Sequence, residues 1–143
     1  MRYIEPTGAD RAFNKIVGLL TGAGISVMGS RVLAVKGRRS GQWRTVPVNL
    51  LTVSGARYLV APRGETEWVR NIRVAGSGEL RLGRKHEPIG VTELPDTEKP
   101  PIVRAYLQRW GWEVGRFFDG LTRNATDEEI MRVAPGFPVF RVD

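Results

Sequence analysis

The stretch VLAVKGRRSGQWRTVPVNLLTVSGARYLVA, residues 32–61, decides the fold. It holds three segments rich in β-branched and aromatic residues, over residues 32–35, 45–53 and 57–61. Turn-forming residues separate them, at 37–42 and at Ser54-Gly55. Short β-rich segments joined by tight turns are typical of an antiparallel meander. This part of the chain therefore predicts a β-sheet.

On either side of the meander the pattern changes to mixed helix and strand. Upstream, Asp10 can cap an amphipathic helix within residues 1–22, whose apolar positions are Phe13, Ile16, Val17 and Leu20. Downstream we expect a helix at 67–75 and a hairpin of 79–82 with 89–94, turning around 85–88. A helix at 100–110 and a helical stretch carrying Phe117 and Phe118 follow. We expect a further helix to start at the capping box Thr126-x-x-Glu129 and a last strand at 139–142. The sequence thus predicts a single α+β domain over residues 1–143, a small barrel with helices packed around it.

Composition limits the chemistry that the chain can perform. It has no cysteine and one histidine, His86. Disulfides, thiolate metal sites, histidine metal clusters and a cysteine nucleophile are therefore excluded, and we expect no metal site. His86 lies in a Lys-His-Glu sequence, where a solvated surface role is expected. Any redox chemistry must come from a bound organic cofactor.

Charge is distributed unevenly along the chain. The formal net charge is +7, and from Arg11 through Gly64 nine Lys or Arg residues are accompanied by no Asp or Glu. This asymmetry favours a polyanionic partner: nucleic acid, an anionic membrane or a phosphorylated small molecule.

The N-terminal segment carries Glu5 and Asp10 where a signal peptide would be basic, so a cytoplasmic protein is expected. We expect the helix in residues 1–22 to pack on the barrel, with an acceptor pocket or a membrane surface as the alternatives for its apolar stripe. Only Arg11 and Lys15 lie on its polar side, so membrane anchoring should be weak.

The turn GRRSGQWR, residues 37–44, has the parts of a phosphate cradle. Glycines let backbone amides converge on an anion, and arginine side chains can grip its oxygens in pairs. It lacks the spacing of a P-loop, and Gly22 and Gly24 supply only half of a dinucleotide fingerprint. Turns of this kind also occur on inert surfaces and on proteins that contact nucleic acid.

The motif GRRSGQWRTVPV at 37–48, followed by LVAPRG at 59–64 and EWVRN at 67–71, resembles the deazaflavin (coenzyme F420)-dependent nitroreductase and quinone reductase family. The resemblance implies a split β-barrel, similar to FMN-binding barrels, with coenzyme F420 lying along its wall. It places the cofactor's phosphate on Arg38, Arg39, Ser40 and Arg44 and the deazaflavin ring beside Pro47 and Val48. Further cofactor contacts are implied for Val60, Ala61, Pro62, Arg63, Glu67, Trp68, Val69, Arg70 and Asn71. From the residues alone, Trp68 could instead be core and Arg70 a solvated helix residue.

The resemblance also implies a reaction, in which a reduced deazaflavin gives hydride to a small electron-poor acceptor: a quinone, an enone or a nitro compound. Arg63 and Arg70 are candidates to stabilise negative charge on the acceptor. Asn49 is a third candidate, because it lies where these reductases carry a tyrosine. The C-terminal segment offers Trp110, Trp112, Phe117 and Phe118, which could line an acceptor pocket or form core, rather than a clear tyrosine hydroxyl. We therefore expect poor activity on nitroaromatic compounds.

Two other functions stay open on the sequence: an FMN or haem binder on a related split barrel, and a basic β-barrel that binds nucleic acid. Nucleic-acid binding calls for aromatic side chains among the basic strands, and residues 31–63 contain only Trp43 and Tyr58. A small-molecule acceptor, without nucleic acid, is the expected partner.

Overall fold

The structure is a computed structural model that describes residues 30–114 and 124–143, with the side chains of 111–114 left out. The predicted helix within residues 1–22 and the stretch carrying Phe117 and Phe118 lie outside the described residues. Among the helices that are described, none is long and apolar enough to cross a membrane.

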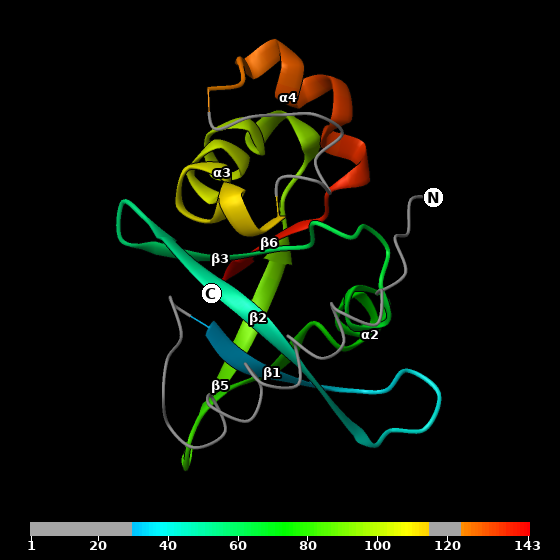
Figure 1. Ribbon diagram of the computed structural model, residues 1–143. Helices are drawn as coiled ribbons and strands as arrows, with labels where there is room; N and C mark the ends of the chain where they lie inside the picture. The colour runs from blue at the N-terminus through cyan, green and yellow to red at the C-terminus, as the bar shows by residue number, and fades with distance from the viewer. Residues whose placement is uncertain (1–29, 115–123) are drawn as a thin grey trace.

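Within the described residues, six antiparallel strands close into a barrel in the order β1-β2-β3-β6-β5-β4. Figure 1 shows this barrel below the helices α3 and α4. The strands are β1 (Ser30–Lys36), β2 (Trp43–Val53), β3 (Ala56–Val60), β4 (Ser77–Leu82), β5 (Lys85–Glu93) and β6 (Val139–Val142). Consecutive short turns join β1 to β2 and β2 to β3, so the predicted meander is confirmed.

The long strand β2 changes partner along its length. Residues 43–49 pair with β1, and residues 50–53 pair with β3. On the side opposite β1, no strand within the described residues pairs with the first half of β2. Pro47 lies in that half, where a residue without an N–H is tolerated because only one edge is hydrogen-bonded.

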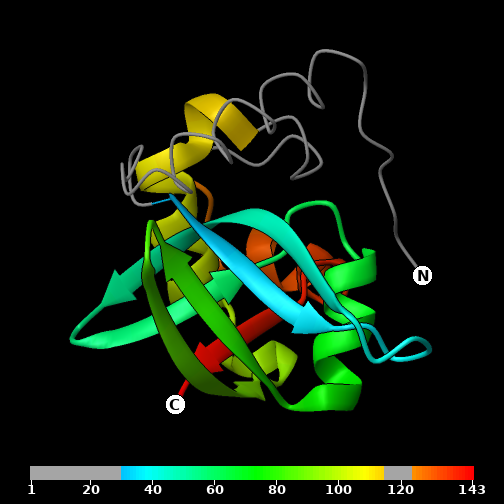
Figure 2. The ribbon, with the colours of Figure 1, turned by 90° about the horizontal axis from the view of Figure 1, so that it is seen from below.

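Helices cover two parts of the barrel. They are α2 (Glu67–Ala75), α3 (Pro100–Val114) and α4 (Asp127–Val133), with 3₁₀ turns η1 (Asp96–Glu98) and η3 (Ala134–Gly136). Figure 2 shows α2 standing at one side of the barrel, against the end of β1 and the turn that follows it. Helix α3 lies across the outside of β2 and β3, and α4 packs on α3.

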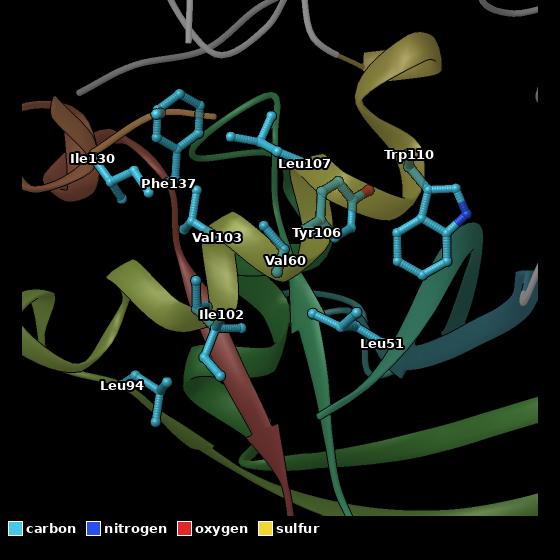
Figure 3. Close-up of a cluster of buried hydrophobic side chains, with 12 residues drawn as sticks. Leu51, Val60, Leu94, Ile102, Val103, Tyr106, Leu107, Trp110, Ile130 and Phe137 are labelled. Atoms are coloured by element: carbon cyan, nitrogen blue, oxygen red, sulfur yellow. The ribbon is translucent and has the colours of Figure 1, made fainter. Parts of the chain in front are cut away.

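Two hydrophobic clusters result from this arrangement. The first fills the barrel interior and is closed by α2 through Val69 and Ile72. The second lies outside the sheet, between β2, β3 and β6 and the helices α3 and α4, and includes Leu51, Tyr106 and Trp110 (Figure 3). The predicted α+β barrel with surrounding helices is confirmed.

One predicted turn is wrong. We expected the hairpin to turn around 85–88, but β4 ends at Leu82 and β5 starts at Lys85, leaving Gly83 and Arg84 as the connection. Gly83 has φ +60°, which glycine adopts without strain. Pro88 pairs with Glu79 inside β5, and β6 pairs with β5 only from Val91 onward. Pro88 therefore lies in the part of β5 that pairs with β4 and not with β6, rather than in a turn.

The local sequence signals located two helices accurately. Helix α2 spans the predicted residues, and Thr126 starts α4 with the predicted capping box, in which its hydroxyl accepts from the Glu129 N–H and its N–H donates to the Glu129 carboxylate.

Candidate cofactor site

The turn at residues 37–42 is held by its own hydrogen bonds. The Gly37 N–H donates to the Gln42 carbonyl at 2.8 Å, and the Gly41 N–H donates to the Gly37 carbonyl at 2.9 Å. The Ser40 hydroxyl accepts from the Gln42 N–H at 3.2 Å. A Cβ added at Gly37 would lie 2.8 Å from the Ser40 Oγ, and Gly41 has φ +71°, so both positions favour glycine. The turn is therefore preformed by its sequence.

Asn71 of α2 fastens this turn to the helix. Its Oδ1 accepts from the Arg38 backbone N–H at 3.1 Å and from the Arg38 Nη1 at 2.8 Å. Asn71 is only 5% exposed, so its amide is committed to these contacts rather than to solvent. The Arg38 Nη1 also donates to the Glu67 Oε2 at 2.9 Å. Three residues that the resemblance assigns to the cofactor thus contact one another.

Positive charge gathers around the Glu67 carboxylate. Its pKa lies below the ordinary value, first because of the Arg38 hydrogen bond and then because of the charges of Arg38, Arg70 and Arg39. Arg44 lies beside the turn itself, since its Cγ would lie 3.8 Å from a Cβ on Gly37. We call Arg38, Arg39, Arg44 and Arg70 the arginine cluster. Within it, Arg39 and Arg44 are exposed to solvent.

In the loop between β3 and α2, backbone atoms rather than side chains are the main groups that a ligand could contact. Val60, Ala61 and Val69 are buried, so any ligand would meet their main chain. Pro62 and Arg63 are half-buried. Thr66 precedes α2 without a side-chain capping bond, and among the described residues its buried Oγ1 has no hydrogen-bond partner. A bound polar group would satisfy that hydroxyl.

Trp68 is partly core. Its ring lies 5.7 Å from that of Phe140, at a tilt of 55°, and packs against the interior cluster. Val48 also packs against that cluster, whereas Pro47, its neighbour in β2, belongs to the opposite face of the strand.

Asn49 shares the outer face of β2 with Pro47 and meets a residue that sequence reasoning missed. Its Nδ2 lies 3.5 Å from the Tyr106 hydroxyl of α3. The Tyr106 and Trp110 ring centroids lie 4.9 Å apart, with the rings tilted by 51° (Figure 3). Tyr106 is 2% exposed and Trp110 fully buried, so these aromatics form core. The sequence alone predicts no clear tyrosine hydroxyl for this site, whereas the structure brings the Tyr106 hydroxyl to Asn49. Trp112 lies in α3, and its side chain is not among those that the structure describes.

The predicted site residues therefore fall into separate groups. The structure joins the turn to α2 through Arg38, Glu67 and Asn71, with Arg39 and Arg70 nearby. Asn49 instead lies further along β2, at the edge of α3.

Comparison with solved structures supports the architecture. An F420-H2 dependent reductase, FDR-A, aligns with a TM-score of 0.57 and 18% identity over 80% of this chain and 94% of its own. A NimC/NimA family protein from Clostridium acetobutylicum aligns at 0.52 and 14% identity over 96% and 83%. A pyridoxamine 5'-phosphate oxidase-like protein from Listeria innocua aligns at 0.50 and 12% over 80% and 82%. No curated protein sequence matches the chain.

These likenesses define the class of fold as a split β-barrel of the flavin-binding type. Residues 9–112 match the family described as F420H(2)-dependent quinone reductase, and the chain belongs to that family. The predicted dependence on coenzyme F420 and the reductase activity are thereby confirmed at the level of the family.

Proposed function

We propose that this chain transfers a hydride from reduced coenzyme F420 to a quinone or an enone, and that the arginine cluster holds the cofactor's phosphate. The observation that carries the proposal is the gathering of three arginines, Arg38, Arg39 and Arg70, around the Glu67 carboxylate next to a glycine-containing turn. Arg44 lies at the start of β2, directly after that turn, and the chain belongs to an F420-dependent family. Such a cluster suits an anion, because charge-assisted hydrogen bonds to phosphate are stronger than neutral ones.

The residues of the turn have different roles in the proposed binding of the phosphate. Arg39 and Arg44 are exposed and can turn toward a phosphate, and Ser40 fixes the turn from inside. Arg38 is already bound by Asn71 and Glu67, so its main role is to hold the turn against α2. The buried Thr66 hydroxyl offers a further polar contact to the same ligand.

When bound, the reduced deazaflavin supplies the hydride, so the protein needs no nucleophile or metal of its own. The protein's part is to orient cofactor and acceptor and to exclude competing reactions. Backbone of the loop at 61–66 and the outer face of β2 at Pro47 are the surfaces proposed for the ring. Arg63 is proposed to stabilise the negative charge that develops on the acceptor. Arg70, the other candidate, acts on Glu67 within the arginine cluster and is assigned to the phosphate instead.

The preference for quinones and enones rests on the surroundings of Asn49. An amide at this position is a poor proton donor, and the Tyr106 hydroxyl beside it is buried. A reduced quinone or enone carries its charge on an oxygen that water can protonate, whereas a nitro group benefits more from a positioned donor.

A substrate panel tests this preference. Oxidation of reduced F420 by menadione, cyclohexenone and a nitroimidazole is followed by absorbance for wild type, Asn49→Tyr and Tyr106→Phe. We expect wild type to favour menadione over the nitroimidazole by at least about 100-fold, the scale of one missing general acid. Asn49→Tyr should narrow that ratio and Tyr106→Phe should leave it unchanged. Equal wild-type rates, or a nitroimidazole rate that collapses in Tyr106→Phe, would show that a proton donor is present after all.

A further inference from the structure

Glu67 is out of place in an anion site. It is the first residue of α2, its side chain is 72% exposed, and its carboxylate binds Arg38 at 2.9 Å within the arginine cluster. The family resemblance treats it as a cofactor contact. A carboxylate is nevertheless the wrong partner for a phosphate, because like charges at short distance repel.

The contacts of Glu67 compete directly with a phosphate. It occupies one donor of Arg38, and the charges of Arg39 and Arg70 act on it as they would on a bound anion. Its position in the first turn of α2 also places its negative charge at the positive end of the helix dipole, where a phosphate oxygen would be favoured.

The carboxylates of Glu65, Glu93 and Glu79 form ion pairs outside the arginine cluster. Glu65 binds Arg73, which also binds Glu93 of β5. Glu79 binds Arg81 within β4. Glu67, in contrast, is directed into the arginine cluster by its contact with Arg38.

We propose that the Glu67 carboxylate competes with the cofactor's phosphate for the arginine cluster and so lowers the affinity for the cofactor. Glu67 thereby sets how strongly the site prefers the phosphorylated cofactor over one without phosphate. The proposal rests on the phosphate assignment made under the proposed function. Asn71 supports this arrangement, since it keeps Arg38 in place whether its remaining donors face Glu67 or a ligand.

The test compares Glu67→Gln with a matched control, Glu65→Gln. The two changes each remove one negative charge, at positions two residues apart, and keep the side-chain shape. In Glu67→Gln the new amide still offers an oxygen to Arg38. The probes are oxidised F420 and the deazaflavin chromophore that lacks the phosphate and glutamate tail. Dissociation constants come from the change in probe fluorescence, at low and at high salt, and thermal melts confirm that each variant is folded.

We expect Glu67→Gln to tighten F420 binding about 5-fold at low salt, as removal of one unit charge a few ångströms away in water predicts. The gain should shrink at high salt because exposed charges are screened. Binding of the tail-less chromophore should not change, and Glu65→Gln should have a smaller effect on F420. Unchanged or weaker F420 binding by folded Glu67→Gln would overturn the proposal, as would equal tightening for both probes. If wild type binds both probes equally well, the phosphate assignment itself fails, which is a distinct result.

Discussion

Replacing Asn71 by alanine should loosen the turn that carries the arginine cluster. The change removes the Oδ1 that accepts from the Arg38 N–H and Nη1. At 5% exposure, water cannot easily replace that oxygen. Leaving a backbone donor without its partner costs about 1–3 kcal/mol, and losing a hydrogen bond to a charged group costs a similar amount. Since the two contacts share one acceptor, we expect a combined loss of about 2–4 kcal/mol in the free energy of unfolding.

The assay for Asn71→Ala is chemical denaturation at equilibrium, together with the dissociation constant for F420. For a chain of this size the loss corresponds to a melting temperature lower by roughly 5–15 °C. Val74→Ala on the exposed face of the same helix is the matched control and should change the free energy of unfolding by about 0.5 kcal/mol or less. Asn71→Asp keeps the acceptor and should retain most of the stability, while its added charge weakens F420 binding. A fully stable Asn71→Ala with normal F420 affinity would refute the view that Asn71 fixes the turn.

Arg39→Ala combined with Arg44→Ala should weaken F420 binding by about 2–5 kcal/mol without unfolding the protein, measured by fluorescence titration, because charge-assisted contacts to phosphate are lost; normal affinity would contradict the phosphate assignment. Acidification should weaken one of the two contacts between the turn and α2, the Arg38–Glu67 ion pair, and leave the Asn71 hydrogen bonds in place. The pKa of Glu67 is lowered by the Arg38 hydrogen bond and nearby arginines, so its stabilising contribution is present at neutral pH and is lost as pH falls below the ordinary carboxylate value of 4.5. Glu67→Gln should flatten that part of a stability-versus-pH curve. Deleting residues 1–22 should leave sedimentation with anionic vesicles almost unchanged, because that segment has few cations; strong wild-type sedimentation that the deletion abolishes would show a membrane-bound helix.

Features that depend on neighbouring residues could be predicted from the sequence. The capping box at Thr126 and the start and end of α2 follow from side chains within one or two turns of the helix, so local patterns located them. The meander was predictable for the same reason, because its turn residues lie between the strands that they join.

Contacts between distant segments could not be predicted in this way. Arg38 lies 33 positions from Asn71 and 29 from Glu67, and only the closure of the barrel brings α2 beside the turn. The resemblance implies that all three contact the cofactor, and their contacts with one another could be found only in the structure. Tyr106 was missed because it lies 57 positions from Asn49, and only the packing of α3 on β2 brings its hydroxyl to that side chain. The hairpin prediction placed Pro88 in the turn, but a proline is also compatible with a strand that pairs along one edge, as β5 does at this position.

The change of partner within β2 has a consequence for how the molecule unfolds. Leu50 packs toward the barrel interior, and the next residue, Leu51, is buried in the cluster beneath α3. Adjacent residues in β3 (Leu59 and Val60) and β6 (Val139 and Phe140) divide between the clusters in the same way. Neither cluster can therefore separate without disturbing strands that both share. We expect the backbone amides at the centre of β2 to exchange with solvent only through global opening, and the helical layer and the barrel to melt in one cooperative transition.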